Sequence, residues 1–278
     1  PISAIQMATI NTAEYFKIAN LGAIAPGYKA DMVVLPNLKD FKPSMVFKEG
    51  MLVAKDGKLI QNLDYVHIPS VRGSVNVNLD KNAFEIKAKS NSVKTINVLP
   101  NQLITKMSVE RIKIDDNNLA QSNIADDVLK IAVIERHRAS GNIGLGFVKG
   151  FGLTCGAIAS TVAHDSHNMI VIGTNDEDMY YAAKELVKSQ GGKIVVNNGQ
   201  TLAHLPLPIA GLMSDRPLEE VIKKVNELNI AAKEIGCTIN DPFMSMAFLS
   251  LSVIPELKIT DKGLIDSNKF EVTELFNV

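Results

Sequence analysis

Four short β-favouring stretches near the start of the chain constrain its fold more than any other feature. They cover residues 30–35, 44–47, 51–55 and 58–60. Asp56-Gly57, between the last two, is a strong signal for a two-residue hairpin. Strands so few and so short do not usually form a stable sheet alone, because such a sheet needs more strands or another packed layer. We therefore expect the missing strands to come from a segment outside this sequence.

The residues before these strands predict a helix. Apolar side chains recur at spacings of three and four from Ile2 to Phe16, and Ser3 is placed early enough to cap that helix. Ala25-Pro26-Gly27 then predicts a type II turn, because proline presets the first corner and glycine takes the positive φ. A domain that opens so abruptly on a helix indicates that further chain precedes it.

A change of pattern near Pro69 predicts a domain boundary. From there to about Asn123 the chain alternates polar and β-favouring residues, with asparagine-rich turns. Val128 to Arg136 predicts a buried strand, whereas Gly141 to Gly152 predicts a loop or tight packing. Residues 193–196 and 201–205 predict a hairpin.

Three helices are predicted in the same region, which makes it an α+β unit. The first covers 176–189 with Asn175 as its cap, and the last begins at Asp241. The longest covers 217–235, with Ser214 or Asp215 as its cap. Its expected buried stripe consists of Leu218, Val221, Ile222, Val225 and Leu228.

Composition restricts the classes of partner. The 278 residues are 46% hydrophobic, which is enough to bury a core, and the net charge is −1. No summed positive field exists to attract nucleic acid or anionic lipid, so neither is expected as a partner. No apolar run reaches the ~20 residues that span a bilayer, and no signal peptide is evident. Cys155 and Cys237 fit neither a CxxC pair nor a zinc spacing, so we expect reduced thiols and a cytoplasmic protein.

The first 60 residues resemble the amidohydrolase superfamily, in the region that follows its last barrel strand. The stretches that carry this resemblance are residues 7–13 and residues 21–34, which include the Pro-Gly turn. The resemblance implies that residues 1–20 are the last helix of a metal-dependent hydrolase (TIM) barrel. It implies that residues 21–68 are strands of a small β-sandwich.

The rest of the chain resembles the carboxyl-terminal domain of the adenine deaminase family. This resemblance rests on residues 150–153, 162–168, 173–179 and 205–214. It implies that residues 69–278 form an α+β domain appended to the barrel. In the intact enzyme, adenine and water would give hypoxanthine and ammonia. A divalent metal, manganese or iron, would be bound by barrel residues that this chain lacks, so the chain alone should not deaminate adenine. Its partners would be the amino-terminal barrel half and further copies of the same enzyme.

The densest polar cluster in apolar surroundings is the candidate site. It consists of His164, Asp165, Ser166, His167 and Asn168. Burying such groups without partners costs a few kcal/mol, so they must be satisfied, hydrated or used. His164 or His167 could donate to a purine ring nitrogen, with Asp165 orienting the imidazole, or the cluster could form an interface. The alternatives are a metal pair and a self-satisfied polar turn.

Other polar groups have simpler explanations. Asn175-Asp176-Glu177-Asp178 could hold a cation, but a capped helix start explains all four. Gly144-x-Gly146 has the wrong spacing for a dinucleotide fingerprint and favours a packing role. His204 is interpreted as structural, and Met244 and Met246 as core. Two functional alternatives stay open: another cyclic amidine or amide hydrolase, and a non-catalytic subunit that assembles with a separate barrel chain.

Overall fold

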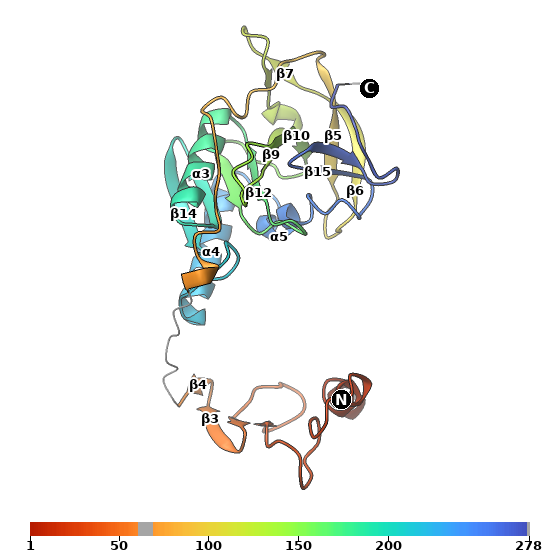
Figure 1. The fold of residues 1–278 in the computed structure, drawn as a ribbon, viewed down its shortest axis with the longest axis vertical. Coiled ribbons are helices and arrows are strands. Elements are labelled where there is room, and N and C mark those ends of the chain that lie inside the picture. The colour runs from red at the N-terminus through yellow and green to blue at the C-terminus, as the bar shows by residue number, and fades with distance from the viewer. Residues whose placement is uncertain (61–68, 277–278) are drawn as a thin grey trace. The chain divides into compact units, whose positions relative to one another are not determined.

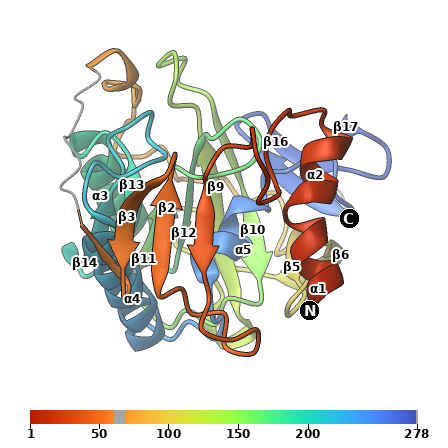
Figure 2. The ribbon, with the colours of Figure 1, turned by 90° about the horizontal axis from the view of Figure 1, so that it is seen from below.

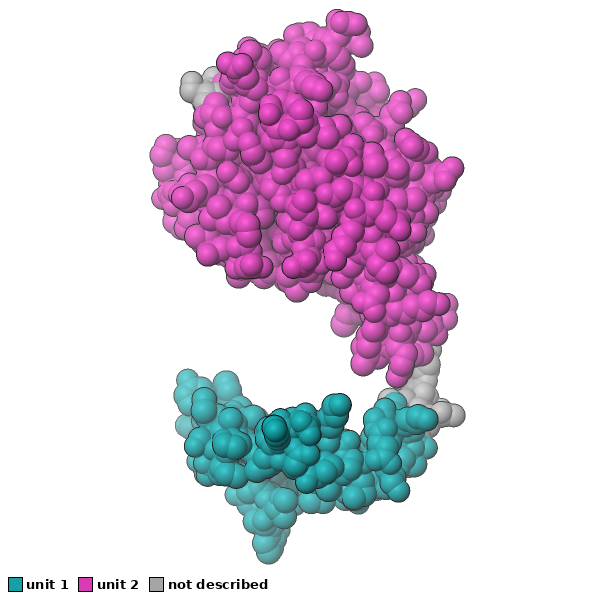
Figure 3. Space-filling view, turned by 180° about the vertical axis from the view of Figure 1, so that it is seen from behind, with its two compact units in different colours: residues 1–67 teal, residues 68–278 magenta. Residues whose placement is uncertain are grey.

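The computed structural model describes residues 1–60 and 69–276. The chain divides into two compact units, Pro1–His67 and Ile68–Val278, which are coloured separately in Figure 3. Each unit contains both helices and strands. Within the described ranges, no helix is both long and apolar enough to cross a membrane.

The strands of unit 1 form one four-stranded antiparallel sheet. Its order is β1-β2-β3-β4, with β1 at Met32–Val34, β2 at Met45–Lys48, β3 at Met51–Lys55 and β4 at Lys58–Leu59. The predicted hairpin is confirmed, because Asp56 and Gly57 have φ values of 48° and 77°, as a type I′ turn requires. The predicted type II turn is also confirmed: Gly27 has φ 81° and Tyr28 N–H donates to Ala25 O at 3.1 Å.

The predicted single helix over Ile2–Phe16 is wrong. The structure has two short helices, α1 at Ile2–Met7 and α2 at Ile10–Tyr15, which Figure 2 shows as successive turns. The break falls at Thr9, whose φ and ψ of −131° and −100° are not helical and whose hydroxyl donates to Ile5 O. Threonine hydroxyls that bond back to the preceding turn compete with the helical ladder. Ser3 makes no cap, because the N-cap position is Pro1.

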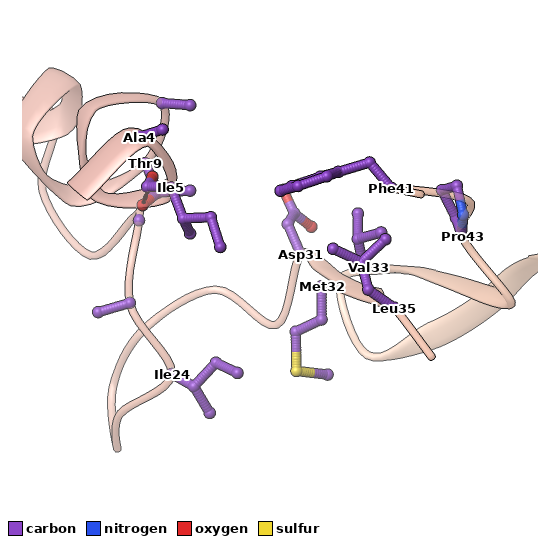
Figure 4. A pocket seen from close by; sticks show the side chains of 13 residues that line it. Ala4, Ile5, Thr9, Ile24, Asp31, Met32, Val33, Leu35, Phe41 and Pro43 are labelled. Atoms are coloured by element: carbon purple, nitrogen blue, oxygen red, sulfur yellow. Dashed lines mark hydrogen bonds between the residues drawn. The ribbon is translucent and has the colours of Figure 1, made fainter. Parts of the chain in front are cut away.

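Unit 1 has almost no core of its own. Among its described residues, Ala13 is the only apolar side chain that is buried. A hollow of about 590 Å³ lies between Ala4, Ile5 and Ala8 of the helical part and Met32 and Val33 of β1, as Figure 4 shows. Large side chains such as Phe16 and Ile24 are exposed at 66% and 89%. Burial of apolar surface is the main driving force of folding, so this unit needs a covering layer.

Unit 2 is built on an eight-stranded sheet with the order β14-β13-β11-β12-β9-β10-β5-β6. Every neighbouring pair is antiparallel except β5 and β10, which are parallel. The strands are β5 Ser92–Val98, β6 Thr105–Arg111, β9 Val128–Ile134, β10 Ile143–Lys149, β11 Ala157–Ser160, β12 Met169–Gly173, β13 Gly192–Asn197 and β14 Gln200–Pro206. A two-stranded sheet joins β7 Lys113–Ile114 to β8 Ala120–Gln121, and short 3-10 helices cover Pro69–Val71 and Ile124–Asp126.

The large sheet is covered on both faces (Figure 1). Helix α3, at Asp176–Lys188, packs on one face through Met179, Ala183 and Leu186. The other face carries α4 at Leu218–Glu234, α5 at Pro242–Ala247 and the small sheet of β15 Leu257–Thr260, β16 Gly263–Asp266 and β17 Glu271–Val272. This mixture of helices and largely antiparallel sheet confirms the predicted α+β character. The described residues form no closed barrel.

Elements with strong local signals are where the sequence places them. All seven residues of β9 are buried, as expected for the stretch that starts at Val128. Asn175 caps α3 by accepting from Asp178 N–H at 2.8 Å. The β13–β14 hairpin turns at Asn198 and Gly199, which both have positive φ. Asp241 caps α5 by accepting from Met244 N–H at 3.1 Å.

The interpretation of Gly141–Gly152 as a loop is wrong, whereas tight packing is right. Most of this stretch is strand β10. Its glycines are there for space: a Cβ at Gly144 would lie 1.8 Å from Thr260 O, and one at Gly146 would lie 3.1 Å from the Leu264 side chain. The β15–β16 hairpin therefore lies directly on the backbone of β10.

The predicted buried stripe of α4 is only half right. Leu228 is buried, whereas Leu218 and Ile222 are exposed at 68% and 51%. The helix buries its carboxyl-terminal half through Ala231 and Ala232, and its first turns extend beyond the core. Neither Ser214 nor Asp215 caps it; its N-cap residue is Pro217, with no side-chain hydrogen bond.

Residues 75–79 form no strand, although Val75 is buried in the core beneath α3.

Candidate functional site

The candidate residues lie in the connection between β11 and β12, and His164 is fixed there by its backbone. His164 N–H donates to Ala247 O at 2.8 Å, and Ser250 Oγ donates to His164 O at 2.8 Å. Both partners belong to the end of α5 and the turn that follows it. The loop is therefore held against the α5 side of the sheet rather than left free in solvent.

The His164 ring lies between two other rings. Its centroid is 5.3 Å from that of His167, edge to face, and 4.9 Å from that of Phe248, tilted by 48°. Rings at such separations interact favourably beyond their buried area. The three rings form a half-buried stack, and the imidazoles keep nitrogen atoms for hydrogen bonding.

His167 is held in an unusual conformation. Its φ of 52° lies in the left-handed region, its N–H donates to Ala163 O, and its carbonyl accepts from Arg136 Nε. Burial lowers the pKa of His167, and the positive charges of His164 and Arg136 lower it further. The His167 ring is therefore neutral at pH 7, and its Nδ1 atom is buried with no partner among the described residues.

The other members of the cluster differ in exposure. Asp165 and Ser166 are exposed, whereas Asn168 is 3% exposed and donates to Asp261 Oδ1 at 3.2 Å. His137 Nε2 is 2.7 Å from Ser166 O. Because a carbonyl only accepts, this His137 nitrogen must carry the proton. The exposed Asp165 carboxylate is free to accept from a ligand amine.

Two residues of this site were missed by the sequence reasoning. Phe248 stacks on His164, and Arg136 binds the loop through the carbonyl of His167. Arg136 follows the apolar run of β9, and a charged residue at the end of such a run is a signal that could have been flagged. Nothing in the sequence indicates the contact of Phe248, which is 84 positions from His164 in the printed numbering.

Phe248 also lines a cavity of about 240 Å³. Polar residues around the cavity include Asn101, Gln102, Thr105 and Asn240, and apolar walls come from Leu103 and Leu249. The ring stack thus borders a cavity on the Phe248 side.

A metal centre does not fit the described residues. Among residues 1–60 and 69–276, no group of three or more His, Cys, Asp or Glu side chains could hold a metal ion. Three of the five histidines gather near the loop, but His137 is occupied by Ser166 O and His167 Nδ1 is buried. The metal-pair interpretation of His164 and His167 gains no support from this geometry.

The remaining candidates have structural roles. Asp176 forms an ion pair with buried Lys130, and Asp178 accepts from Gly199 N–H at 2.8 Å, so the helix-start interpretation is confirmed. His204 lies in β14, where burial lowers its pKa. Met246 is buried as expected, whereas Met244 is 51% exposed. His67 lies outside the described residues.

Glu135 organises the turn that follows β9 next to this site. Its carboxylate accepts N–H groups from His137 at 2.6 Å, Arg138 at 2.9 Å and Ser140 at 3.0 Å. Desolvation acts to raise the pKa of Glu135, but these bonds outweigh it and lower the pKa from 4.5 to about 2. A lowered pKa means that the ionised group stabilises the fold above pH 4.5 and that this contribution is lost as the pH falls through about 2.

Replacing Glu135 with Gln should therefore lower stability on the order of 1 kcal/mol at pH 7, a small value because the residue is only half-buried and water screens its charge. The variant should also lose part of the acid dependence below pH 4.5. Urea unfolding between pH 2 and pH 7 checks both expectations. Equal acid dependence in the two proteins would contradict them.

Two known protein families and several known proteins are similar to this chain. Residues 102–271 match the adenine deaminase C-terminal domain, and residues 1–59 match the amidohydrolase family. The chain is 48% identical to an adenine deaminase of Desulfatibacillum aliphaticivorans, over 99% of the chain and 48% of that protein. It is 47% identical to adenine deaminase 2 of Carboxydothermus hydrogenoformans, over 97% of the chain and 48% of that protein.

A third relative, an adenine deaminase of Methanothrix thermoacetophila, is 45% identical over 99% of the chain and 48% of its own length. The chain thus spans about half the length of the curated relatives it matches. The matched C-terminal domain covers most of the large sheet and the loop with His164. The match of residues 102–271 shows that the chain belongs to the adenine deaminase C-terminal domain family, and residues 1–59 before it are similar to the amidohydrolase family.

Proposed function

We propose that the whole protein is an adenine deaminase that converts adenine and water into hypoxanthine and ammonia. The observation that carries this proposal is the match of residues 102–271 to the adenine deaminase C-terminal domain. Relatives named adenine deaminase support it, because their identity of 45–48% extends over nearly the whole chain. The amidohydrolase match alone would fit other hydrolases of cyclic amidines or amides as well.

The metal centre belongs, in this proposal, to the part of the protein that the chain does not include. Amidohydrolases suggest a divalent metal, here manganese or iron, which supplies an activated water for hydrolysis. Unit 1 supports this division, because Met7 of α1 and Phe16, which follows α2, are 67% and 66% exposed and need an apolar cover. We propose that residues 1–20 of this unit are the last helix of a barrel and that residues 21–68 are strands of a small β-sandwich.

The loop with His164 is proposed to border the adenine site or the interface that forms it. The two imidazoles carry ring nitrogens that can hydrogen-bond to a purine, and Asp165 can accept from its amine. The stack with Phe248 offers an aromatic edge beside them. A polar turn whose hydrogen bonds are all made internally explains the loop only in part, because His167 Nδ1 and Asn168 Oδ1 lack partners among the described residues.

Location and assembly are further parts of the proposal. Cys155 and Cys237 are both free, which suits a reducing cytoplasm. The net charge of −1 supports neither nucleic acid nor a membrane as a partner. Assembly with further copies of the same protein is proposed from the resemblance to the family. A non-catalytic subunit that joins a separate barrel chain is the alternative that the exposed apolar side of unit 1 also fits.

A chimaera tests whether this chain can serve as part of an adenine deaminase. In it, this chain replaces the matching half of the Desulfatibacillum adenine deaminase, and ammonia release is measured from adenine, guanine, cytosine and a cyclic amide. The metal-binding barrel then comes from the relative, so activity on adenine close to that of the intact relative supports the proposal. A folded chimaera that releases no ammonia from adenine would contradict it. The intact relative serves as the positive control.

A further inference from the structure

Arg136 is a buried cation that joins three separate segments through their carbonyls. It is 1% exposed and lies just beyond β9. Its Nε donates to His167 O, Nη1 donates to Ser74 O at 3.1 Å, and Nη2 donates to Ala210 O at 3.1 Å. No carboxylate in residues 1–60 or 69–276 forms an ion pair with it. The guanidinium therefore holds three backbone carbonyls together and is not paired with a carboxylate of the described residues.

Such a group is costly to bury without partners, and each of its three nitrogens makes one of these hydrogen bonds. Desolvation lowers the pKa of Arg136 to about 10, which still leaves it charged at neutral pH. A guanidinium has a rigid planar fork of donors, whereas a lysine ammonium is a single point. Arginine is therefore the residue that can reach three carbonyls in different directions from one buried position.

The surroundings of the guanidinium leave it little room to move. A Cβ at Gly211 would lie 2.7 Å from Arg136 Nη1, so only glycine fits there. Gly211 is itself fixed, because its carbonyl accepts from Thr161 Oγ1 at 2.6 Å. Thr161 begins the connection that carries His164 and His167. The guanidinium thus lies between two of the segments that it holds, the Ala210–Gly211 turn and the connection between β11 and β12.

We propose that Arg136 is a positioning residue that fixes the rings of His167 and His164 by holding the His167 carbonyl. The bond from Nε locks His167 in its left-handed conformation, which most residues adopt only at a cost. Because the His167 ring contacts the His164 ring edge to face, a fixed His167 ring also restricts where the His164 ring can lie. The importance of these rings for adenine rests on the proposed function, whereas their positioning by Arg136 does not.

The charges that face His167 support this assignment. Burial lowers the pKa of His167, as do His164, Arg136 and His137, while Asp165 acts in the opposite direction. Releasing the loop into water removes the largest of these causes, the burial. A loop that loses its anchor should therefore show a His167 pKa closer to its ordinary value.

The test replaces Arg136 with Lys in the full chain and follows the histidine rings by NMR titration. The chain has five histidines, so each ring signal can be assigned with single His→Gln variants. We expect the His167 signal to shift and its pKa to rise toward its ordinary value. The pKa of His204, lowered by burial in β14, should stay unchanged. Unchanged His167 signals in a folded Arg136→Lys variant would overturn the proposal.

A matched control removes another buried cation. Lys258 is fully buried, and its Nζ donates to Leu103 O at 3.0 Å as its single acceptor among the described residues, so Lys258→Met should lower stability without moving the His167 pKa. A wild-type measurement covers the case in which Arg136→Lys does not fold. The Nε–H of Arg136 should exchange with water at least about 100-fold more slowly than that of exposed Arg138, as buried bonded groups do. Equal exchange rates would overturn the proposal without any variant.

The same variant in the chimaera separates this proposal from the proposed function. A displaced His167 pKa together with a raised KM for adenine supports both. A displaced pKa with unchanged adenine kinetics keeps the positioning role and removes the loop from the adenine site. An unchanged pKa overturns the positioning role whatever the kinetics show.

Discussion

Replacing Asp176 with Ala is expected to lower the free energy of unfolding of the chain by about 3–5 kcal/mol, because it leaves a buried cation unpaired. The Lys130 side chain is 2% exposed, and its Nζ lies 2.6 and 2.8 Å from the two carboxylate oxygens of Asp176. Its remaining partner is Phe84 O at 3.2 Å, a neutral acceptor. Urea unfolding followed by far-ultraviolet circular dichroism measures the loss.

Glu177 provides the matched control for this variant. It also lies in the first turn of α3, but it is exposed and forms no ion pair with any residue that the structure describes, so Glu177→Ala should cost less than about 1 kcal/mol through the helix dipole alone. A double variant, Lys130→Met with Asp176→Leu, should recover much of the loss, because apolar residues can replace a buried pair. A cost for Asp176→Ala equal to that for Glu177→Ala would show that Lys130 is hydrated in solution.

Replacing His164 with Ala in the chimaera is expected to lower kcat/KM for adenine by about 10- to 100-fold, as the loss of one to two good hydrogen bonds to a bound ligand would. The side chain contacts His167 and Phe248, so its removal also frees the stack beside the cavity. Steady-state ammonia release measures the effect. His164→Gln should recover part of the activity, because an amide restores one donor.

His204→Ala is the control, since this histidine lies in β14 and contributes nothing to the loop. Its kcat/KM should stay within about twofold of the unsubstituted chimaera. A His164→Ala variant with full activity in the chimaera, but with weaker binding of the separate chain to the separately produced amino-terminal half of the relative, would assign the loop to an interface. Full activity with unchanged association would leave only a structural role for it.

The elements that sequence reasoning predicted are those specified by neighbouring residues. Asn175 and the acids after it define the start of α3, and Asp56-Gly57 defines a hairpin, because capping and turn chemistry act over a few positions. Strand β10 was missed because its glycines serve the approach of Thr260, more than a hundred positions away. The exposure of Leu218 was missed because the end of the core is set by the length of the sheet and not by the helix pattern.

Part of the candidate site can likewise be recognised in the sequence, and the rest depends on the fold. The cluster from His164 to Asn168 is visible in the sequence because polar residues interrupt an apolar region. The partners that hold it, Arg136 and Phe248, come from other strands and turns, so their contacts depend on tertiary packing. The lowered pKa of His167 also arises from that packing, through burial and the nearby cations. A sequence therefore indicates which groups need partners and leaves their identity to the fold.

Ammonia release from adenine, measured with added manganese or iron for this chain alone and for the chimaera, tests the central claim most directly. The account predicts no release by the chain, because it assigns the metal centre to the half that the chain does not include, and turnover by the chimaera that a chelator abolishes. Turnover by the chain alone would contradict the account, since the chemistry would then reside in residues to which it assigns only a supporting role.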